Sequence, residues 1–196
     1  MFGKEEKRVR LDEICEHFGD GDWIESKDQS EEGIRLIQTG NVGNGEYLDK
    51  GDKAHYISED TFCRLNCTEV CPGDILISRL PDPIGRACIV PNMQKSITAV
   101  DCTIVRLKDC VVPEFFVNYT RTATYMMQIE AFTTGSTRKR ISRANLGSIM
   151  VPIPTLDKQN EFVALAEQSD KSKFDLQQSI ISVNNLYKKI INEKLS

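Results

Sequence analysis

From Thr155 to Leu195 the chain contains neither proline nor glycine, the two residues that most often interrupt a helix. Thr155 is suited to accept a free backbone N–H group at a helix start, and Asp157 places a negative charge near the positive end of the helix dipole. A helix of about 40 residues rises about 1.5 Å per residue, which gives a length of roughly 60 Å. Such a rod is too long to pack along its whole length on a domain built from the preceding residues.

An apolar stripe runs along the second half of this predicted helix. Its members are Leu176, Ile180, Val183, Tyr187 and Ile190. They follow one another at steps of four and three residues in alternation, which is the heptad spacing of a coiled-coil seam. The pattern favours a coiled coil with a helix from a partner chain. The alternative is a terminal helix that packs partly on its own domain.

Before residue 155, short apolar runs alternate with turn-forming stretches. The runs that predict strands are Ile34–Gln38, Asp74–Ser78, Ala87–Val90 and Thr103–Leu107. Helices are predicted after the N-cap residue Ser58 and from Pro113 to about Ala131. We therefore expect an α+β fold: a globular domain over residues 1–154, with helices packed on a mixed sheet of short strands, and one long helix over residues 155–196.

Charge is unevenly distributed along the chain. Residues 1–60 carry 16 acidic and 8 basic side chains, net −8, whereas residues 61–155 carry 7 acidic and 11 basic ones, net +4. The overall net charge of −4 has the wrong sign for a free, nonspecific DNA-binding protein. If the chain binds DNA, the middle segment or a partner subunit must supply the positive charge.

The sequence contains no apolar run near the roughly 18–20 residues of a membrane span, and its N-terminus lacks the apolar core of a signal peptide. We therefore expect a cytoplasmic protein with no membrane association, in which the seven cysteines are reduced. Cys63, Cys67 and Cys71 recur every four residues and could share one helix face. Neither histidine has the spacing of a metal ligand, so no metal ion or cofactor is expected.

The signatures of common catalytic sites are missing from the sequence. It contains no GxxxxGK[ST] phosphate loop, no GxGxxG dinucleotide turn and no GxSxG nucleophile turn. The Asn/Asp-Pro-Pro-aromatic tetrapeptide expected of an adenine methyltransferase is also missing. Asp20 and Asp22 form a carboxylate pair, but in such an acidic segment we interpret them as solvated surface residues. We expect no catalytic residues and a binding function; an enzyme with an unrecognised site is less favoured.

The densest group of basic residues lies between residues 134 and 143 (TGSTRKRISR). Hydroxyl and backbone N–H groups bind phosphate oxygens, and an arginine can form two hydrogen bonds with guanine in the major groove. The candidate DNA-binding residues of this segment are Ser136, Thr137, Arg138, Lys139, Arg140 and Arg143. The alternative interpretation is a solvated basic turn before a short helix capped by Ser142.

Two further segments carry residues suited to DNA. Arg79 and Arg86 flank a proline-containing loop, where they could hold a DNA backbone or be ordinary surface charges. Gln38, Thr39 and Asn41 follow a predicted strand. Glutamine and asparagine suit the adenine edge in the major groove, although Thr-Gly-Asn is also common turn chemistry.

These segments, in this order, resemble the specificity subunits of type I restriction–modification systems. Residues 33–42 (GIRLIQTGNV) are similar to the family's strand followed by T-G-N-I. Residues 72–79 (PGDILISR) and 84–91 (IGRACIVP) are similar to P-G-D-I-L-x-S/T-R and I-G-K-x-A-I-V. Residues 134–142 (TGSTRKRIS) and 149–159 (IMVPIPTLDKQ) are similar to S-G-S-T-x-x-x-I-S and I-x-I-P-L-P-P-L-x-E-Q.

The resemblance implies a non-catalytic subunit in which a target-recognition domain precedes a long conserved helix. A full-length subunit of this family repeats that unit twice, and its two helices form an antiparallel coiled coil that separates the two recognition domains. Each domain recognises one half of a split sequence in double-stranded DNA. The subunit docks adenine methyltransferase subunits and, in the complete enzyme, a translocating endonuclease subunit. The candidate residues of the three segments are then expected to face DNA, and the long helix to serve dimerisation and methyltransferase docking.

The chain departs from the family pattern because it holds one unit instead of two. A half-length subunit would act as a homodimer, with a second copy supplying the other helix, and two-fold symmetry would make its target an interrupted palindrome. A fragment and a silent gene copy are the other interpretations of a single unit. The alternative function is a coiled-coil DNA-binding or regulatory interaction protein that works without any methyltransferase. Pro81 and Pro83 in the arginine loop also depart from the pattern, which bears on the bases recognised.

Overall fold

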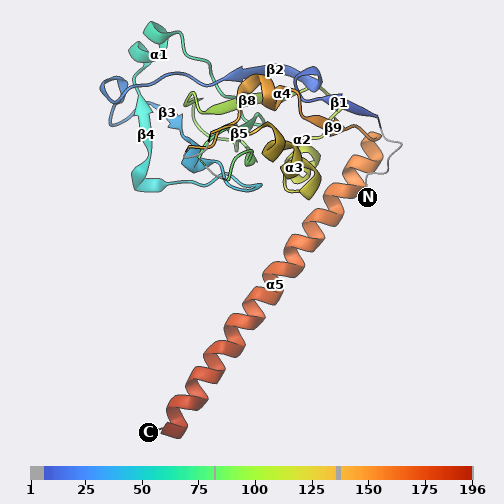
Figure 1. The fold of residues 1–196 in the computed structure, drawn as a ribbon. Helices are drawn as coiled ribbons and strands as arrows, with labels where there is room; N and C mark the ends of the chain where they lie inside the picture. The colour runs from blue at the N-terminus through green and yellow to red at the C-terminus, as the bar shows by residue number, and fades with distance from the viewer. Residues whose placement is uncertain (1–6, 82, 136–137, 196) are drawn as a thin grey trace.

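The computed structural model describes residues 7–81, 83–135 and 138–195, which form a globular head and one long helix that projects from it (Figure 1). The strands are β1 (Arg8–Arg10), β2 (Cys15–Asp20), β3 (Ile34–Ile37), β4 (His55–Ile57), β5 (Ile75–Ser78), β6 (Ala87–Ile89), β7 (Ser96–Thr98), β8 (Cys102–Leu107) and β9 (Met150–Pro152). The α-helices are α1 (Glu59–Leu65), α2 (Pro113–Thr120), α3 (Ala123–Phe132), α4 (Arg143–Gly147) and α5 (Leu156–Leu195). Short 3-10 helices are η1 (Asp12–Ile14), η2 (Ser26–Asp28), η3 (Thr39–Asn41) and η4 (Gly51–Lys53). These elements confirm the α+β fold with a long C-terminal helix.

A four-stranded antiparallel sheet, in the order β2-β8-β5-β6, forms the middle layer of the head. Its strand β5 is covered on both faces, since Ile75, Leu76 and Ile77 are all fully buried. Ile75 and Ile77 pack in one cluster with the aromatic side chains of α2 and α3. Leu76 packs in a second cluster with Ile37 of β3. An unbroken apolar run is typical of a strand buried on both faces.

Two smaller sheets complete the head. Strand β3 pairs antiparallel with β4 and parallel with β7, and β1 pairs antiparallel with β9. The second pair brings the start of the described chain beside the segment that leads into α5. Beyond the strand, the Ile153 N–H group donates to the Lys7 carbonyl at 2.9 Å. The base of α5 is therefore held by the first strand.

The four predicted strands are confirmed as β3, β5, β6 and β8, each within one residue at either end. Strands β1, β2, β4, β7 and β9 were not predicted from the sequence. Four of these five strands are only three residues long, too short to show an alternating pattern. Strand β2 has six residues, but it carries charged residues and a glycine in place of an isoleucine- and valine-rich run.

The helix predicted from Pro113 to about Ala131 is wrong in one respect, because two helices occupy this stretch. Helix α2 ends at residue 120 and α3 begins at residue 123. Between them, the Thr122 hydroxyl accepts the Tyr125 N–H group at 3.3 Å and so caps α3. The sequence analysis overlooked this threonine as an N-cap.

Helix α1 begins after Ser58, as predicted, and ends where Asn66 adopts a left-handed conformation with φ of 51°. Cys67 and Cys71 therefore lie beyond the helix, and the shared helix face considered for three cysteines does not form. All seven cysteines are free thiols. Burial raises the pKa of Cys67 to about 11.

A buried glutamine joins α5 to the head. The Gln159 side chain, fully buried, accepts the Val112 N–H group at 2.8 Å. It also donates to the carbonyl groups of Cys110 and Pro154, both at 2.9 Å. One side chain therefore links the first turn of α5, the segment before it and the start of α2.

Two more contacts hold the first turns of α5 against α2. The Phe115 and Phe162 rings pack edge to face with centroids 5.6 Å apart. Arg121 forms two hydrogen bonds with Asp170, at 2.6 and 2.9 Å. Farther along, the helix leaves the head (Figure 1), and the five seam residues are 44–65% exposed. The helix thus packs partly on its own domain, while its predicted seam lies uncovered in the single chain.

Candidate nucleic-acid interface

Strands β2 and β5 end at the point where β8 begins. Asp20, the last residue of β2, pairs with Thr103, and Ser78, the last residue of β5, pairs with Cys102. The described residues of the loops that meet at this edge are 21–23, 79–81, 83–86 and 99–101. Two of the three segments singled out in the sequence contribute to this edge or lie against it, as the following contacts show.

Asp20 is not a solvated surface residue, as the sequence analysis interpreted it, because it lies between two arginines. Its carboxylate oxygens are 3.2 Å from Arg79 and 3.5 Å from Arg143. The Arg79 guanidinium also donates to the Val100 carbonyl at 2.6 Å, and only 14% of its side chain is exposed. Arg79 is therefore held inside the edge of the head, whereas Arg143 is half exposed.

Asp22 is half-buried and fixes the next loop. Its carboxylate accepts the Thr68 N–H group at 3.0 Å. Its backbone N–H donates to Thr98, and its carbonyl accepts from Val100, at 2.8 and 2.9 Å. Burial raises the pKa of Asp22 against the opposing effect of the Thr68 hydrogen bond. The carboxylate pair therefore holds loops in place, and the exposed Trp23 follows directly after it.

The basic segment forms a hairpin beside these loops. Thr134 and Arg140 exchange two backbone hydrogen bonds of 2.9 Å. Gly135 has φ of 98°, a conformation that favours glycine. The Ile141 N–H group donates to the Arg79 carbonyl at 3.3 Å, which places the hairpin against the arginine loop. Ser142 caps the short helix α4, as the alternative interpretation of this segment proposed.

The hairpin presents its cations to solvent. Arg138, Lys139 and Arg140 are all exposed. Ser136 and Thr137, also predicted to contact DNA, lie outside the described residues. The three described cations have no role in the core that would account for their position.

A surface pocket of about 690 Å³ lies between the hairpin and the loops. Its lining residues are Trp23, Leu80, Asp101, Thr134, Gly135, Arg138 and Arg140. The pocket combines an aromatic ring, a carboxylate and two guanidinium groups. These are the side-chain types that contact base edges and phosphates in protein–DNA interfaces.

The loop between Arg79 and Arg86 packs against α3. The Tyr125 hydroxyl donates to the Gly85 carbonyl at 3.1 Å. Gly85 has φ of 82°, and a Cβ atom there would lie 2.8 Å from the Ile129 side chain. Glycine is therefore required at this position, both for the backbone conformation and for the close approach to α3.

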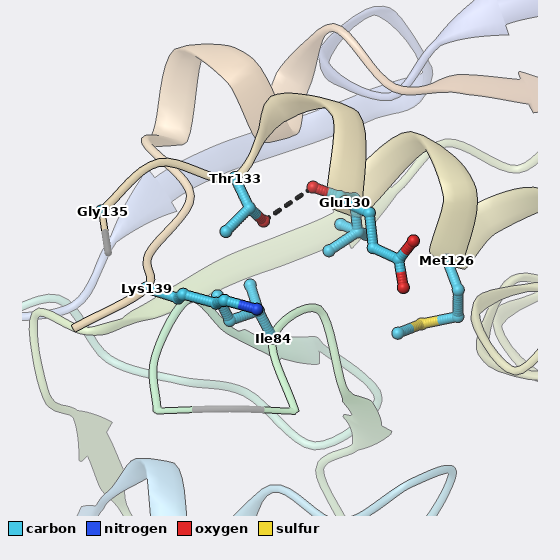
Figure 2. Close-up of a pocket in the computed structure, with 7 residues that line it drawn as sticks. Ile84, Met126, Glu130, Thr133, Gly135 and Lys139 are labelled. Atoms are coloured by element: carbon cyan, nitrogen blue, oxygen red, sulfur yellow. Dashed lines mark hydrogen bonds between the residues drawn. The ribbon is translucent and has the colours of Figure 1, made fainter. Parts of the chain in front are cut away.

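The hairpin, the arginine loop and α3 meet around a second pocket, of about 420 Å³ (Figure 2). Lys139 extends from the hairpin over Ile84 of the arginine loop, and Glu130 projects from α3 on the opposite side. The Thr133 hydroxyl donates to the Ile129 carbonyl at 2.7 Å, where α3 ends. The two candidate DNA-binding loops are thus packed together on one helix.

Arg86 lies near Arg79 at the start of β8. Burial raises the pKa of Cys102 to about 11, and both arginines act in the opposite direction on this thiol. Within the described residues, the buried Nε atoms of both arginines have no hydrogen-bond partner. The two ends of the loop meet through the backbone, because the Ser78 N–H group donates to the Arg86 carbonyl at 2.9 Å.

The third segment, residues 38–41, forms hydrogen bonds that stabilise its own turn. Asn41 is 3% exposed; its side-chain oxygen accepts the Gln38 N–H group at 3.0 Å, and its side-chain nitrogen donates to the Leu48 carbonyl at 2.8 Å. Because its amide is occupied inside the protein, we omit Asn41 from the proposed DNA-binding face. Gln38 and Thr39, both half-exposed, stay predictions.

The sequence analysis missed Trp23, Leu80 and Asp101, which line the first pocket beside the arginines. The only signal in the sequence was a lone tryptophan next to Asp22. Among residues 7–81, 83–135 and 138–195, no group of three His, Cys, Asp or Glu side chains could hold a metal ion. In the same ranges, no helix has the length and apolar character needed to cross a membrane.

Solved structures share this fold. One is 19% identical to this chain, with a TM-score of 0.69 over 91% of this chain and 42% of that one. It is described as showing the structural basis of complex assembly and conformational transition of the type I R-M system. The HsdS subunit from Thermoanaerobacter tengcongensis is 18% identical, with a TM-score of 0.67 over 91% and 40%. The type I restriction-modification S subunit from M. genitalium is 13% identical, with a TM-score of 0.56 over 87% and 41%. The chain spans about two fifths of each of these structures.

No curated protein matches the chain. A family model does: the type I restriction modification DNA specificity domain matches residues 4–184, which is most of the sequence. The match confirms the resemblance that the three ordered segments indicated. The chain belongs to the family of type I restriction modification DNA specificity domains.

Proposed function

We propose that this chain recognises double-stranded DNA as a non-catalytic specificity subunit, and that it binds through the face formed by the basic hairpin and the arginine loop. The observation that carries the proposal is the exposure of Arg138, Lys139 and Arg140 beside a pocket that also holds Trp23. The net negative charge of the chain comes mainly from residues 1–60, and Asp20, the acidic residue of that segment nearest the arginines, is already paired with Arg79 and Arg143. A local basic face can therefore meet a phosphate backbone that the whole chain would repel.

The residues of this face have different parts in the proposal. The exposed hairpin cations bind phosphates or guanine edges, and Arg143 adds charge at the start of α4. Arg79 and Arg86 are more enclosed; the Arg79 side chain is held by Val100 and Asp20, so its main contribution is to hold the neighbouring strand ends together.

The long helix supports a second part of the proposal, a homodimer. The five exposed seam residues place apolar area in water along one side of α5, and a second copy of the chain would cover them. In an antiparallel coiled coil the two heads would lie at opposite ends, related by two-fold symmetry. The dimer would then recognise an interrupted palindrome. We further propose that adenine methyltransferase subunits dock on it and, in a complete enzyme, a translocating endonuclease subunit.

The experiment for recognition is a methylation map. The chain is produced together with the methyltransferase encoded beside its gene, and methylated adenines are located across the host genome. We expect a bipartite motif that disappears when the chain is omitted. If no methylation depends on the chain, the proposal fails, and an interaction protein that acts without a methyltransferase becomes the better interpretation.

The dimer has its own test, the mass of the chain in solution. We expect two copies at micromolar concentration and one copy in the Ile180→Asp variant, which places a charge in the seam. The matched control is Gln178→Asp, an exposed position two residues away on another side of the helix. A wild-type chain that stays monomeric at high concentration would contradict the two-headed arrangement.

A further inference from the structure

The lone tryptophan is the most exposed large apolar side chain among the described residues. Trp23 is 71% exposed, whereas the uncovered seam residues of α5 reach at most 65%. Tryptophan carries the largest apolar surface of any residue, and it is enriched where proteins bind partners. A ring left in water on the head, outside the dimer seam, therefore requires its own explanation.

The backbone that carries this ring is rigid. Gly21 donates its N–H group to the Cys102 carbonyl at 3.0 Å, and a Cβ atom at Gly21 would lie 2.4 Å from the Ala99 and Thr98 carbonyl oxygens. The Asp22 hydrogen bonds described above fix the next residue on the same loop. The backbone on the N-terminal side of Trp23 is therefore held by hydrogen bonds to two neighbouring segments. Binding of a partner by the ring then costs little conformational entropy of this loop.

The surroundings of the ring are cationic on the side of the pocket. Trp23 and Leu80 supply its apolar wall, and Arg138 and Arg140 of the hairpin line the same pocket. Two residues after the tryptophan, the Glu25 carboxylate is paired with Lys27 at 2.8 Å, so a lysine neutralises this acidic neighbour.

We propose that Trp23 is the apolar residue of the DNA-binding face that contacts the bases. The hairpin arginines Arg138 and Arg140 bind the phosphates on either side of it. Apolar side chains contact thymine methyl groups or press between base steps, while arginines beside them bind phosphates. Arg138 and Arg140 outnumber Asp101 in the pocket, and this excess of positive charge favours DNA over a protein partner as the occupant. This inference rests on the proposed DNA-binding function and adds a residue that contacts the bases.

Because the chain has one tryptophan, tryptophan emission excited selectively over the five tyrosines reports on this site alone. The full-length chain first selects duplexes from a random-sequence DNA pool through repeated rounds of binding and amplification. The enriched duplexes are then titrated into the chain. We expect quenching and a blue shift of the emission, with protection from acrylamide, at the concentrations where labelled duplex binds by fluorescence anisotropy.

Variants separate a base contact from a general attraction. Trp23→Ala should weaken binding to the enriched duplex by roughly tenfold, as the loss of one aromatic–base contact does, without changing the salt dependence, because the indole displaces no counterion. Trp23→Phe should recover part of the affinity. Met127→Ala is the control, a residue that is 62% exposed on α3, and it should bind as the wild type does.

The outcomes distinguish this inference from the function on which it rests. If the pool yields no enriched duplex, the DNA-binding function itself fails. If duplex binds while tryptophan emission and Trp23→Ala affinity stay unchanged, DNA recognition stands and the inference is overturned.

Discussion

Replacement of Gln159 by methionine tests how α5 is held on the head. The substitution keeps the length and approximate volume of the side chain but removes its three hydrogen bonds to Val112, Cys110 and Pro154. Each buried backbone group left without a partner costs about 1–3 kcal/mol. Because Cys110 is exposed and its carbonyl can reach water, we place the total at roughly 3–5 kcal/mol. This is a large part of the roughly 5–15 kcal/mol that stabilises a typical domain.

The assay for this variant is urea unfolding, followed by far-UV circular dichroism and compared with the wild type. The control is Asn160→Ala, an exposed neighbour on the same helical turn, which should change the free energy of unfolding by less than about 0.5 kcal/mol. A Gln159→Met variant within about 1 kcal/mol of the wild type would refute the reasoning that these hydrogen bonds fix the helix to the head.

Three further expectations follow from individual contacts. Arg121 lowers the pKa of Asp170, so their ion pair stabilises the fold above the unfolded pKa of about 3.9. This stabilisation is lost as the pH falls through the lower folded pKa. Asp170→Asn should remove that pH dependence and cost less than about 1 kcal/mol of stability, measured by thermal melts. Gly85→Ala should lower the free energy of unfolding by about 1–3 kcal/mol in urea titrations, because of its positive φ and the nearby α3 side chain. Exposed Cys63 should react with a thiol reagent at pH 8, whereas buried Cys88, with its pKa raised by burial to about 12, should react only in denaturant, as mass spectrometry of the labelled chain would report.

Much of the fold could be predicted from the sequence because its longest signals are local. A proline-free stretch with a heptad pattern indicated α5, and isoleucine-rich runs indicated β3, β5, β6 and β8. The break between α2 and α3 was missed because one capping threonine interrupts an otherwise helical pattern. The three-residue strands were missed since they form by pairing with distant segments, and their own residues carry little periodic signal.

The site could be predicted only in part, for a similar reason. The arginines of the basic hairpin were identified from their clustering in the sequence. The burial of Asn41 and the pairing of Asp20 with Arg79 and Arg143 depend on tertiary contacts that spacing does not reveal. Trp23 lies more than 100 residues before the hairpin in the sequence, and only the convergence of strand ends brings it into the same pocket.

The most direct test of the account is the salt dependence of DNA binding by the Arg138→Ala, Arg140→Ala double variant. Each phosphate contact contributes about 0.9 to the slope of log affinity against log salt concentration, so loss of two contacts in a head should reduce the slope by about 1.8 for each head that is bound, and should weaken binding at low salt. The matched control is Lys188→Ala, Lys189→Ala on the distal part of α5, which removes the same charge and should leave the slope unchanged. A double hairpin variant that binds a mixed-sequence duplex with wild-type affinity and slope would contradict the assignment of this face to DNA.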